Sequence, residues 1–372
     1  MILQEYVPQY RAPFFEALHE RAERSGIEIV VACGRPREAQ RLRGDAVELN
    51  FLTSIKQREW KIFGRRVVVR NIRAVIQDAD LVILEQARRN LDAYRLLMRR
   101  RSVKQVVALW GHGRDYTHEA GKVNQFLQHW LTSKADWFFA YTEGGASAVS
   151  DRGFARSKIT VVQNSIDTGE LRREVGAVTA ESKEAFRSER GLHGMTAIFI
   201  GALDESKRLA FLIDSAERVH RLLPAFRLLI AGDGPLRQEV EAWADQHAWL
   251  TFLGSVSGAQ KANALAGSEI LAMPGRVGLV AVDSFAARLP IVTTAWKWHA
   301  PEFEYLTDGV TAVITDDTVE SFAQAMCDTL SNPEQLNRLG DACEFAATAF
   351  TIDAMADNFL AGIQAILKGE RA

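Results

Sequence analysis

One segment decides the fold of this chain: Met273-Pro-Gly-Arg-Val-Gly-Leu-Val-Ala-Val-Asp-Ser-Phe-Ala286, followed by the apolar run Leu289-Pro-Ile-Val-Thr-Thr294. The pattern predicts a strand over 269–273, a glycine-rich turn, a helix starting near Gly278 and a second strand. Such a turn aims unpaired backbone N–H groups and the positive end of a helix dipole at one point, which favours a phosphate or diphosphate. Asp283 lies about a turn further along, where a carboxylate can bind ribose hydroxyls. A tight turn that binds nothing is the alternative.

The length and composition of the chain indicate a globular protein of two domains. Its 372 residues are more than a single domain with one core typically has. The composition, with 47% apolar and 25% charged residues, is ordinary for a globular protein. The net charge of −2 hides an asymmetry. Residues 1–170 carry an excess of Lys and Arg, and the remainder carries an excess of Asp and Glu.

Three basic clusters lie in the first half: Arg65-Arg66, Arg88-Arg89 and Arg99-Arg100-Arg101. They can attract an anionic lipid surface or an acidic acceptor, or they can be solvated helix faces. No aromatic-basic repeat or helix-turn-helix pattern accompanies them, so we expect no nucleic acid as a partner.

The compartment is predicted from what the sequence lacks. The cysteines (Cys33, Cys327 and Cys343) form no Cys-x-x-Cys and no metal-like pairing with His. We see no signal-peptide pattern, and no apolar stretch approaches the ~18 residues of a membrane span. We therefore expect a cytoplasmic protein, and leave open a peripheral contact with the inner membrane through the basic first domain.

Short apolar runs alternate with longer helical patterns along the whole chain. The expected strands of the first series are Ile2–Tyr6, Ile27–Ala32, Val67–Arg70, Leu81–Leu84, Val103–Leu109, Trp137–Tyr141 and Ile159–Val162. Those of the second series are Ala197–Gly201, Arg227–Ala231, Leu250–Leu253, Ile270–Met273, Ile291–Thr294 and Ala312–Ile314. Apolar strands alternating with helices predict parallel sheets covered on both faces, so the fold class is α/β, with two doubly wound, Rossmann-like domains.

The domain boundaries follow from this rhythm. We predict one domain over residues 1–168 and a second over 190–348, joined by a polar connector around Gly169–Arg190. A final helix within 349–372 is expected to pack back towards the first domain. Ligands of such folds lie outside the carboxyl ends of the strands, so the expected site is a cleft that the two domains face.

Further motifs lie at strand ends of the second series. Phe199-Ile-Gly-Ala-Leu-Asp-Glu-Ser-Lys207 ends a strand in Gly201 and opens the next helix with a lysine. This lysine can place an ammonium on a bound phosphate, or it can be a solvated surface side chain. Two further segments also end a strand in a glycine: Leu229-Ile-Ala-Gly-Asp-Gly-Pro-Leu236 and Thr251-Phe-Leu-Gly-Ser-Val256.

In order and spacing these segments resemble the family 4 glycosyltransferases, retaining GT-B enzymes that use nucleotide-sugar donors. The resemblance covers most of the chain and is strongest over Ile198–Leu306. Lys207 matches a lysine that binds the donor diphosphate, whereas Ala202 stands where the family has an arginine. Asp283 matches the second of two family acids, the ribose contact. Gly275 takes the place of the first acid, which touches the donor sugar.

The resemblance implies a C-terminal nucleotide-sugar domain and an N-terminal acceptor-side domain. Arg276 lies beside the missing acid, and one hypothesis is that it takes over the diphosphate contact of the missing arginine; a surface side chain on a turn is the alternative. The predicted donor-binding residues are Gly201, Lys207, Val256, Gly275, Arg276, Val277, Gly278, Leu279 and Asp283.

The first domain contributes two candidate segments. Trp110-Gly-His-Gly-Arg114 follows a predicted strand, and the family often carries a histidine there, so His112 is the predicted catalytic residue; a turn histidine with a structural hydrogen bond is the alternative. The loop Val7-Pro-Gln-Tyr-Arg-Ala-Pro-Phe-Phe15 is similar to the family's first loop. Its acceptor-side candidates are Gln9, Tyr10 and Arg11.

The predicted chemistry is sugar transfer without a metal or other cofactor. No Asp-x-Asp follows a strand, and Asp316-Asp317 is expected to cap a helix. Lys207, Arg276 and the turn at Gly278 would then stabilise the leaving diphosphate. The expected partners are a nucleotide-sugar donor and a glycan, lipid-linked or small-molecule acceptor. A GT-B nucleotide-sugar epimerase and a catalytically degenerate nucleotide-sugar-binding protein are the alternatives.

Overall fold

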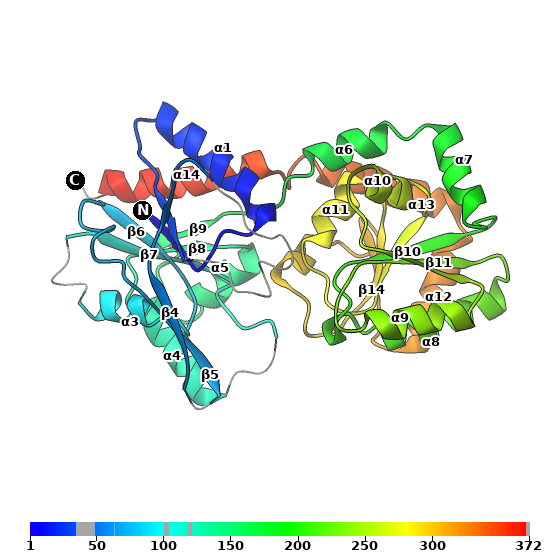
Figure 1. The fold of residues 1–372 in the computed structure, drawn as a ribbon, viewed down its shortest axis with the longest axis horizontal. Coiled ribbons are helices and arrows are strands. Elements are labelled where there is room, and N and C mark those ends of the chain that lie inside the picture. The colour runs from blue at the N-terminus through cyan, green and yellow to red at the C-terminus, as the bar shows by residue number, and fades with distance from the viewer. Residues whose placement is uncertain (35–48, 63, 100–103, 118–120, 370–372) are drawn as a thin grey trace. The chain divides into compact units, whose positions relative to one another are not determined.

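The computed structural model describes residues 1–34, 49–62, 64–99, 104–117 and 121–369, which form two compact units (Figure 1). Unit 1 consists of Met1–Ile166 together with Ile352–Ala372, and unit 2 is Asp167–Thr351. The chain therefore leaves unit 1, builds unit 2 and returns to unit 1 with its last helix.

Unit 1 is built on a parallel sheet covered by helices on both faces. The described residues give seven strands in the order β3-β2-β1-β6-β7-β8-β9. These are β1 (Ile2–Gln4), β2 (Val31–Cys33), β3 (Leu52–Ser54), β6 (Leu81–Glu85), β7 (Val106–Gly111), β8 (Trp137–Ala140) and β9 (Ile159–Val161). The helices are α1 (Ala12–Arg24), α3 (Leu91–Met98), α4 (Lys122–Ser133), α5 (Glu143–Ser150) and α14 (Ile352–Gly369), with short 3₁₀ turns η1 (Gln9–Arg11) and η3 (Arg156–Lys158).

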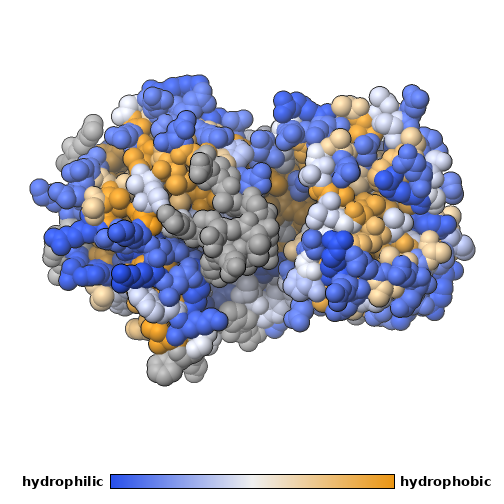
Figure 2. Space-filling view, in the orientation of Figure 1, coloured by the Kyte–Doolittle hydropathy of each residue, from blue (hydrophilic) through white to orange (hydrophobic). Residues whose placement is uncertain are grey.

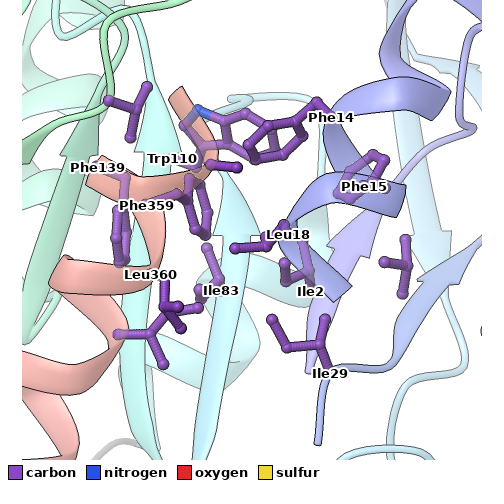
Figure 3. Close-up of a cluster of buried hydrophobic side chains, with 14 of the residues drawn as sticks. Ile2, Phe14, Phe15, Leu18, Ile29, Ile83, Trp110, Phe139, Phe359 and Leu360 are labelled. Carbon is purple, nitrogen blue, oxygen red and sulfur yellow. The ribbon is translucent and has the colours of Figure 1, made fainter. Parts of the chain in front are cut away.

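The C-terminal helix completes the core of unit 1. Helices α1 and α14 pack on one face of the sheet, and α3, α4 and α5 pack on the other. Phe359 of α14 stacks on Phe139 of β8 with ring centroids 4.4 Å apart and meets Trp110 of β7 edge-on at 5.0 Å (Figure 3). All three rings are buried. Aromatic pairs of this kind contribute ~0.5–1.5 kcal/mol beyond the area they bury.

One predicted strand does not join the parallel sheet, and this corrects our expectation for Val67–Arg70. It lies in β5 (Arg65–Arg70), which pairs antiparallel with β4 (Gln57–Ile62), a strand that the sequence analysis missed. β4 is polar and alternates instead of forming a continuous apolar run, so it lacks the signal of a buried parallel strand.

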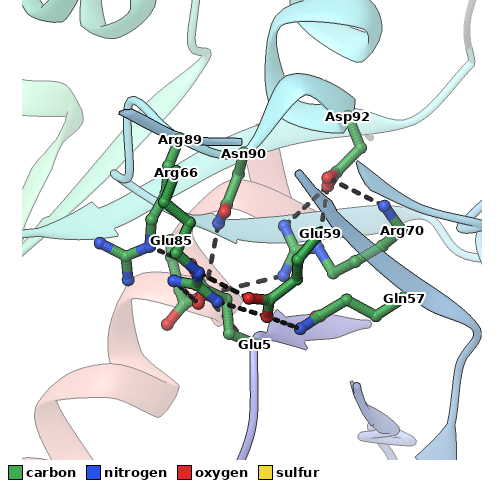
Figure 4. A network of polar contacts seen from close by, with 9 residues as sticks. All are labelled: Glu5, Gln57, Glu59, Arg66, Arg70, Glu85, Arg89, Asn90 and Asp92. Atoms are coloured by element: carbon green, nitrogen blue, oxygen red, sulfur yellow. Dashed lines mark hydrogen bonds and ion pairs between the residues drawn. The ribbon is translucent and has the colours of Figure 1, made fainter. Parts of the chain in front are cut away.

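Buried ion pairs attach this hairpin to the rest of unit 1 (Figure 4). Arg70 is 2% exposed and its Nη2 lies 2.7 Å from Oδ2 of Asp92 at the start of α3. Arg66 lies 2.7 Å from Glu5, directly after β1, and 2.6 Å from Glu59 of the hairpin itself. Removing one partner of a buried pair typically costs ~3–5 kcal/mol, because the other charge stays buried.

Unit 2 repeats the doubly wound plan. Its described residues form a six-stranded parallel sheet in the order β12-β11-β10-β13-β14-β15. The strands are β10 (Thr196–Ile200), β11 (Arg227–Ala231), β12 (Leu250–Gly254), β13 (Ile270–Met273), β14 (Ile291–Thr294) and β15 (Ala312–Thr315). The helices are α6 (Gly169–Gly176), α7 (Ala180–Glu189), α8 (Leu209–Leu222), α9 (Arg237–Gln246), α10 (Gly258–Ala266), α11 (Val280–Ala286), α12 (Val319–Leu330) and α13 (Pro333–Ala346), with 3₁₀ turns η4 (Glu205–Lys207) and η5 (Pro301–Tyr305).

The stretch expected to be a polar connector is instead part of unit 2. Helices α6 and α7 lie there and pack against α10. The side chain of Thr179 accepts a hydrogen bond from the Ser182 amide and so caps α7. The high charge of this stretch belongs to the solvent-facing sides of two helices, which is why composition alone suggested a linker.

Candidate functional site

The candidate site of unit 2 lies where its strand order reverses. Strands β10 and β13 are neighbours in the sheet, although β11, β12 and their helices lie between them along the chain. Connections from these two strands run to opposite sides, which leaves a crevice at their carboxyl ends in folds of this type. The segments that follow β10 and β13 therefore meet at this edge.

Lys207 and the turn after β13 are in direct contact. Nζ of Lys207 donates a hydrogen bond to the carbonyl oxygen of Arg276 over 2.6 Å, and the Arg276 amide donates to the Ser206 carbonyl over 2.9 Å. Burial lowers the pKa of Lys207 from its ordinary value to about 8. The negative charge of Asp204 opposes this shift, and the positive charge of Arg276 adds to it. The lysine is thus mostly protonated at neutral pH and retains N–H groups beyond the one it gives to the turn.

Gly275, which stands in place of the first family acid, has no room for a side chain. A Cβ at this position would lie 2.5 Å from both the Ser206 carbonyl oxygen and the Lys207 carbonyl carbon. Both atoms belong to backbone, which cannot move aside as the end of a flexible side chain can. The glycine is therefore required by the close approach of the two segments.

The guanidinium of Arg276 is oriented by the segment after β14. Its Nη1 donates to the carbonyl oxygen of Trp298 over 3.0 Å. Its predicted contact with the donor diphosphate is not tested by this bond and stays a prediction.

His299, which was not among the residues predicted from sequence, holds the turn in place. Its Nδ1 accepts from the Val277 amide over 3.1 Å, and its Nε2 contacts the Thr294 carbonyl oxygen over 2.8 Å. A neutral ring that donates from Nε2 satisfies both contacts. Burial lowers the pKa of His299 to about 4, and its ring stacks on Phe303 at 3.9 Å. The Val277 amide is thus occupied by protein in this conformation.

The next amides of the turn remain open. Within the described residues, the N–H groups of Gly278, Leu279 and Val280 donate no hydrogen bond. Helix α11 begins at Val280, two residues after the expected start, and is short. These open N–H groups lie on the same turn as the Arg276 carbonyl oxygen, which accepts the hydrogen bond from Lys207.

Asp283 lies on α11 but is already paired. Its Oδ2 is 2.9 Å from Nζ of Lys261 on α10, and the two side chains are 14% and 24% exposed. Lys261 was not predicted from sequence, since a single lysine in a helical pattern carries no signal of its own. The pair leaves Asp283 one further carboxylate oxygen for a hydroxyl group.

Two other predicted donor residues frame the same edge. Gly201 follows β10 and lies against Gly232, which follows β11. A Cβ on Gly232 (φ +148°) would lie 1.8 Å from the Gly201 carbonyl oxygen, so a glycine is needed at position 232 for the two segments to approach. Val256 follows β12 and lines a pocket of about 340 Å³ between α7 and α10.

The predicted residues of unit 1 gather at the carboxyl edge of its sheet. His112 follows β7, is exposed, and its ring centroid lies 4.6 Å from that of Tyr141, which follows β8. Arg11 lies 5.8 Å from the centroid of the same Tyr141 ring. Tyr141 therefore joins the two segments that the sequence analysis selected separately.

The three acceptor-side candidates differ in exposure. Gln9 and Tyr10 are exposed on η1. Arg11 is only 6% exposed, and its Nη1 donates to Oδ1 of Asn164 over 2.8 Å. The guanidinium thus ties the first loop to the segment after β9, which makes Arg11 an internal support of this edge.

Three arginines of the basic clusters are paired within unit 1. Arg66, Arg88 and Arg89 each form ion pairs with acidic side chains of the same unit. Arg100-Arg101 lies outside the described residues. The attraction of these clusters to an anionic surface therefore stays a prediction.

The aspartates after β15 do not cap the next helix as expected. Thr318 caps α12, and Asp317 accepts a hydrogen bond from Arg208. The described residues hold no group of three or more His, Cys, Asp or Glu side chains that could bind a metal ion. Among the helices of the described ranges, none has both the length and the apolar character of a membrane-spanning segment.

Curated relatives match part of the chain. It is 28% identical over 253 residues to a D-inositol 3-phosphate glycosyltransferase of Segniliparus rotundus, which is 64% of this chain and 54% of that protein. It is 32% identical over 106 residues to a phosphatidyl-myo-inositol mannosyltransferase of Mycobacterium tuberculosis, 27% of this chain and 28% of that protein. The chain thus spans about half or less of the length of these relatives.

Solved structures share the fold along nearly the whole chain. HepE of Anabaena, solved with UDP, has a TM-score of 0.71 at 12% identity and covers 98% of this chain and 99% of its own. Sucrose-phosphate synthase of Thermosynechococcus elongatus has a TM-score of 0.71 at 12% identity, with 99% and 98% covered. At such identities the likeness establishes the GT-B fold.

Family models match each unit separately. Residues 12–165 match a glycosyl transferase 4-like domain, and residues 194–332 match the glycosyl transferases group 1. With most of the chain covered by these two models, it belongs to the glycosyltransferases of the GT-B fold.

Proposed function

We propose that this protein transfers a sugar, with retention of configuration and without a metal ion, from a nucleotide-sugar donor to a glycan, lipid-linked or small-molecule acceptor. The observation that carries the proposal is the contact between Lys207 and the 275–279 turn at the switch point of unit 2. The D-inositol 3-phosphate glycosyltransferase and the phosphatidyl-myo-inositol mannosyltransferase among its relatives support this class of reaction.

In this proposal the donor diphosphate occupies the edge formed by Lys207 and the open amides of Gly278, Leu279 and Val280. An ammonium and several N–H groups can share the charge that develops on the leaving diphosphate. Asp283, which pairs with Lys261 through Oδ2, takes a ribose hydroxyl on its other carboxylate oxygen. His112 and the exposed Gln9 and Tyr10 then serve the sugar and acceptor from unit 1.

A catalytically degenerate donor-binding protein is the second candidate, and one observation favours it. Gly275 cannot carry the sugar-binding acid of the family, since backbone fills the space of any Cβ. Binding without turnover is its distinguishing property.

A donor panel separates the two candidates. Wild-type protein is titrated with UDP-, GDP- and ADP-sugars by calorimetry, and nucleotide release is followed with and without acceptors. Binding and release that Lys207→Met abolishes support the transferase, and binding without release in every mixture supports the degenerate protein. If no nucleotide binds, both candidates fail.

A further inference from the structure

Unit 1 holds a cavity of about 290 Å³ between α4, α5 and the segment that follows α5. The two helices pack on the same face of the parallel sheet (Figure 1). Residues 152–155 and Lys158 of the following segment complete the wall. We call this space the α4–α5 cavity. None of the site residues predicted from sequence is among those that line it.

The floor of the α4–α5 cavity belongs to the core of unit 1. Thr132, Ala135 and Val149 line the cavity and are buried. Phe154 also lines it, and its ring meets that of Phe138 edge-on with centroids 6.4 Å apart. Because buried side chains in a packed core have fixed positions, the floor is formed before any ligand arrives.

The rim of the cavity is basic. His129, Arg152 and Lys158 line it and are exposed, and no Asp or Glu lines it. Within the described part of the chain these three side chains form no ion pair and no hydrogen bond. Arg156 lies between the two cations in sequence but does not line the cavity, and its Nη2 is 2.7 Å from Oε1 of Glu143. The basic groups that face the cavity are therefore the ones left without a partner.

The arrangement of these groups is more informative than their exposure. Many hydrophilic side chains lie on the visible face of unit 1, so a single exposed cation is no sign of a site (Figure 2). Here the segment that carries both cations is ordered by its own backbone. The Gly153 amide donates to the Ser150 carbonyl oxygen over 2.8 Å, and the Lys158 amide donates to the Ala155 carbonyl oxygen over 2.9 Å. Positive charges held at one cavity repel each other, and a bound anion removes this repulsion.

The chemistry of the rim and the size of the cavity select the ligand. A guanidinium binds two phosphate oxygens at once, an ammonium adds a point charge, and an imidazole adds an N–H donor. A carboxylate carries one charge and would leave one of the two cations without a counter-charge. The volume is near the lower limit of small-molecule sites, which begin at roughly 300 Å³. This favours a phosphate monoester with a small carbon skeleton over a nucleotide-sugar.

We propose that the α4–α5 cavity binds a small soluble phosphate monoester. Its phosphate group lies among Arg152, Lys158 and His129, and its carbon skeleton lies on Val149 and Phe154. The site is independent of the proposed function, because every residue that lines it belongs to unit 1 and the proposed donor diphosphate site belongs to unit 2.

Calorimetric titration of the full chain with glycerol 3-phosphate tests the site. The wild type should show saturable binding that weakens as salt is added, and glycerol without the phosphate should not bind. Arg152→Gln and Lys158→Gln should each weaken the binding about tenfold, the loss expected for one charged hydrogen bond. Lys158→Arg keeps the charge and should retain most of the affinity.

Two control variants locate the binding. Arg156→Gln removes a cation of the same segment that does not line the cavity, and should weaken binding by no more than about twofold. Lys207→Met removes the ammonium of the proposed donor site and should bind glycerol 3-phosphate as the wild type does. Circular dichroism should show all variants folded.

Four outcomes overturn the proposal. They are no binding by the wild type, binding that Arg152→Gln/Lys158→Gln leaves unchanged, an equal loss in Arg156→Gln, and a loss in Lys207→Met. An equal loss in Arg156→Gln would show attraction by the general surface charge, and a loss in Lys207→Met would place the ester in unit 2. Failure of the nucleotide-sugar panel leaves this test unaffected, since glycerol 3-phosphate carries no nucleotide.

Discussion

Introducing a glutamate at Gly275, where the family resemblance places an acid, should impair this protein instead of improving it. A Cβ would lie 2.5 Å from two backbone atoms of the Ser206–Lys207 segment. Carbon atoms pack at ~3.5–4.0 Å, so the turn would have to retreat by about 1 Å. That movement would break the contacts of the Arg276 amide and carbonyl with Ser206 and Lys207.

The size of the effect follows from the packing. Forcing extra atoms into a filled site typically costs ~1–3 kcal/mol. For a domain of this size, each kcal/mol lowers the melting temperature by about 2–4 °C, so Gly275→Glu should melt about 2–12 °C below the wild type. Gly275→Ala adds the clashing Cβ alone and should account for most of this loss.

Differential scanning calorimetry and donor titration measure both consequences. Nucleotide affinity should fall at least about tenfold, since Lys207 loses its position on the turn. Gly176→Ala and Gly176→Glu are the controls, because a Cβ at Gly176 on α6 meets no atom within 4 Å. An unchanged melting temperature together with tighter donor binding or faster transfer in Gly275→Glu would refute the reasoning.

Other predictions concern the charges and hydrogen bonds of the same site. Lys207→Met should weaken nucleotide binding by about 10- to 100-fold in calorimetry, the loss expected for one charged hydrogen bond, while Lys207→Arg should restore part of it. Burial lowers the pKa of Lys207 to about 8, so nucleotide affinity should fall above about pH 8. Over the range from about 8 to its ordinary value the nucleotide-free protein should gain stability with pH, as the unfolded state there binds more protons; a flat pH profile, or one matched by Lys207→Met, contradicts this. Asp283→Ala should weaken the binding of nucleosides that carry ribose hydroxyls more than the binding of their dideoxy analogues. Lys261→Met should lower the free energy of unfolding less in an Asp283→Asn background than in the wild type, as a double-mutant cycle measured by urea unfolding would show. His299→Phe should cost about 1–3 kcal/mol of stability because the Val277 amide loses its buried acceptor, with His299→Gln recovering part; equal stability of all three proteins would show that the bond does not hold the turn.

Some features of the site could be found from sequence because their signal is local. Lys207 and the glycine-rich turn each follow an apolar strand, and the carboxyl ends of adjacent parallel strands share one edge. Lys261 and His299 could not be found in this way, because their partners lie 22 residues away in each case. A side chain whose function depends on a distant partner shows no pattern in its own segment.

The sequence by itself determined two doubly wound α/β units, since apolar strands alternating with helices can be buried only in covered parallel sheets. It also placed the phosphate-binding candidates at strand ends. Only the tertiary structure decided that α6 and α7 join unit 2, that Val67–Arg70 leaves the sheet for a hairpin, and that no side chain fits at Gly275. Periodicity reports which face of a segment is buried, whereas these outcomes depend on which distant atoms fill the space beside it.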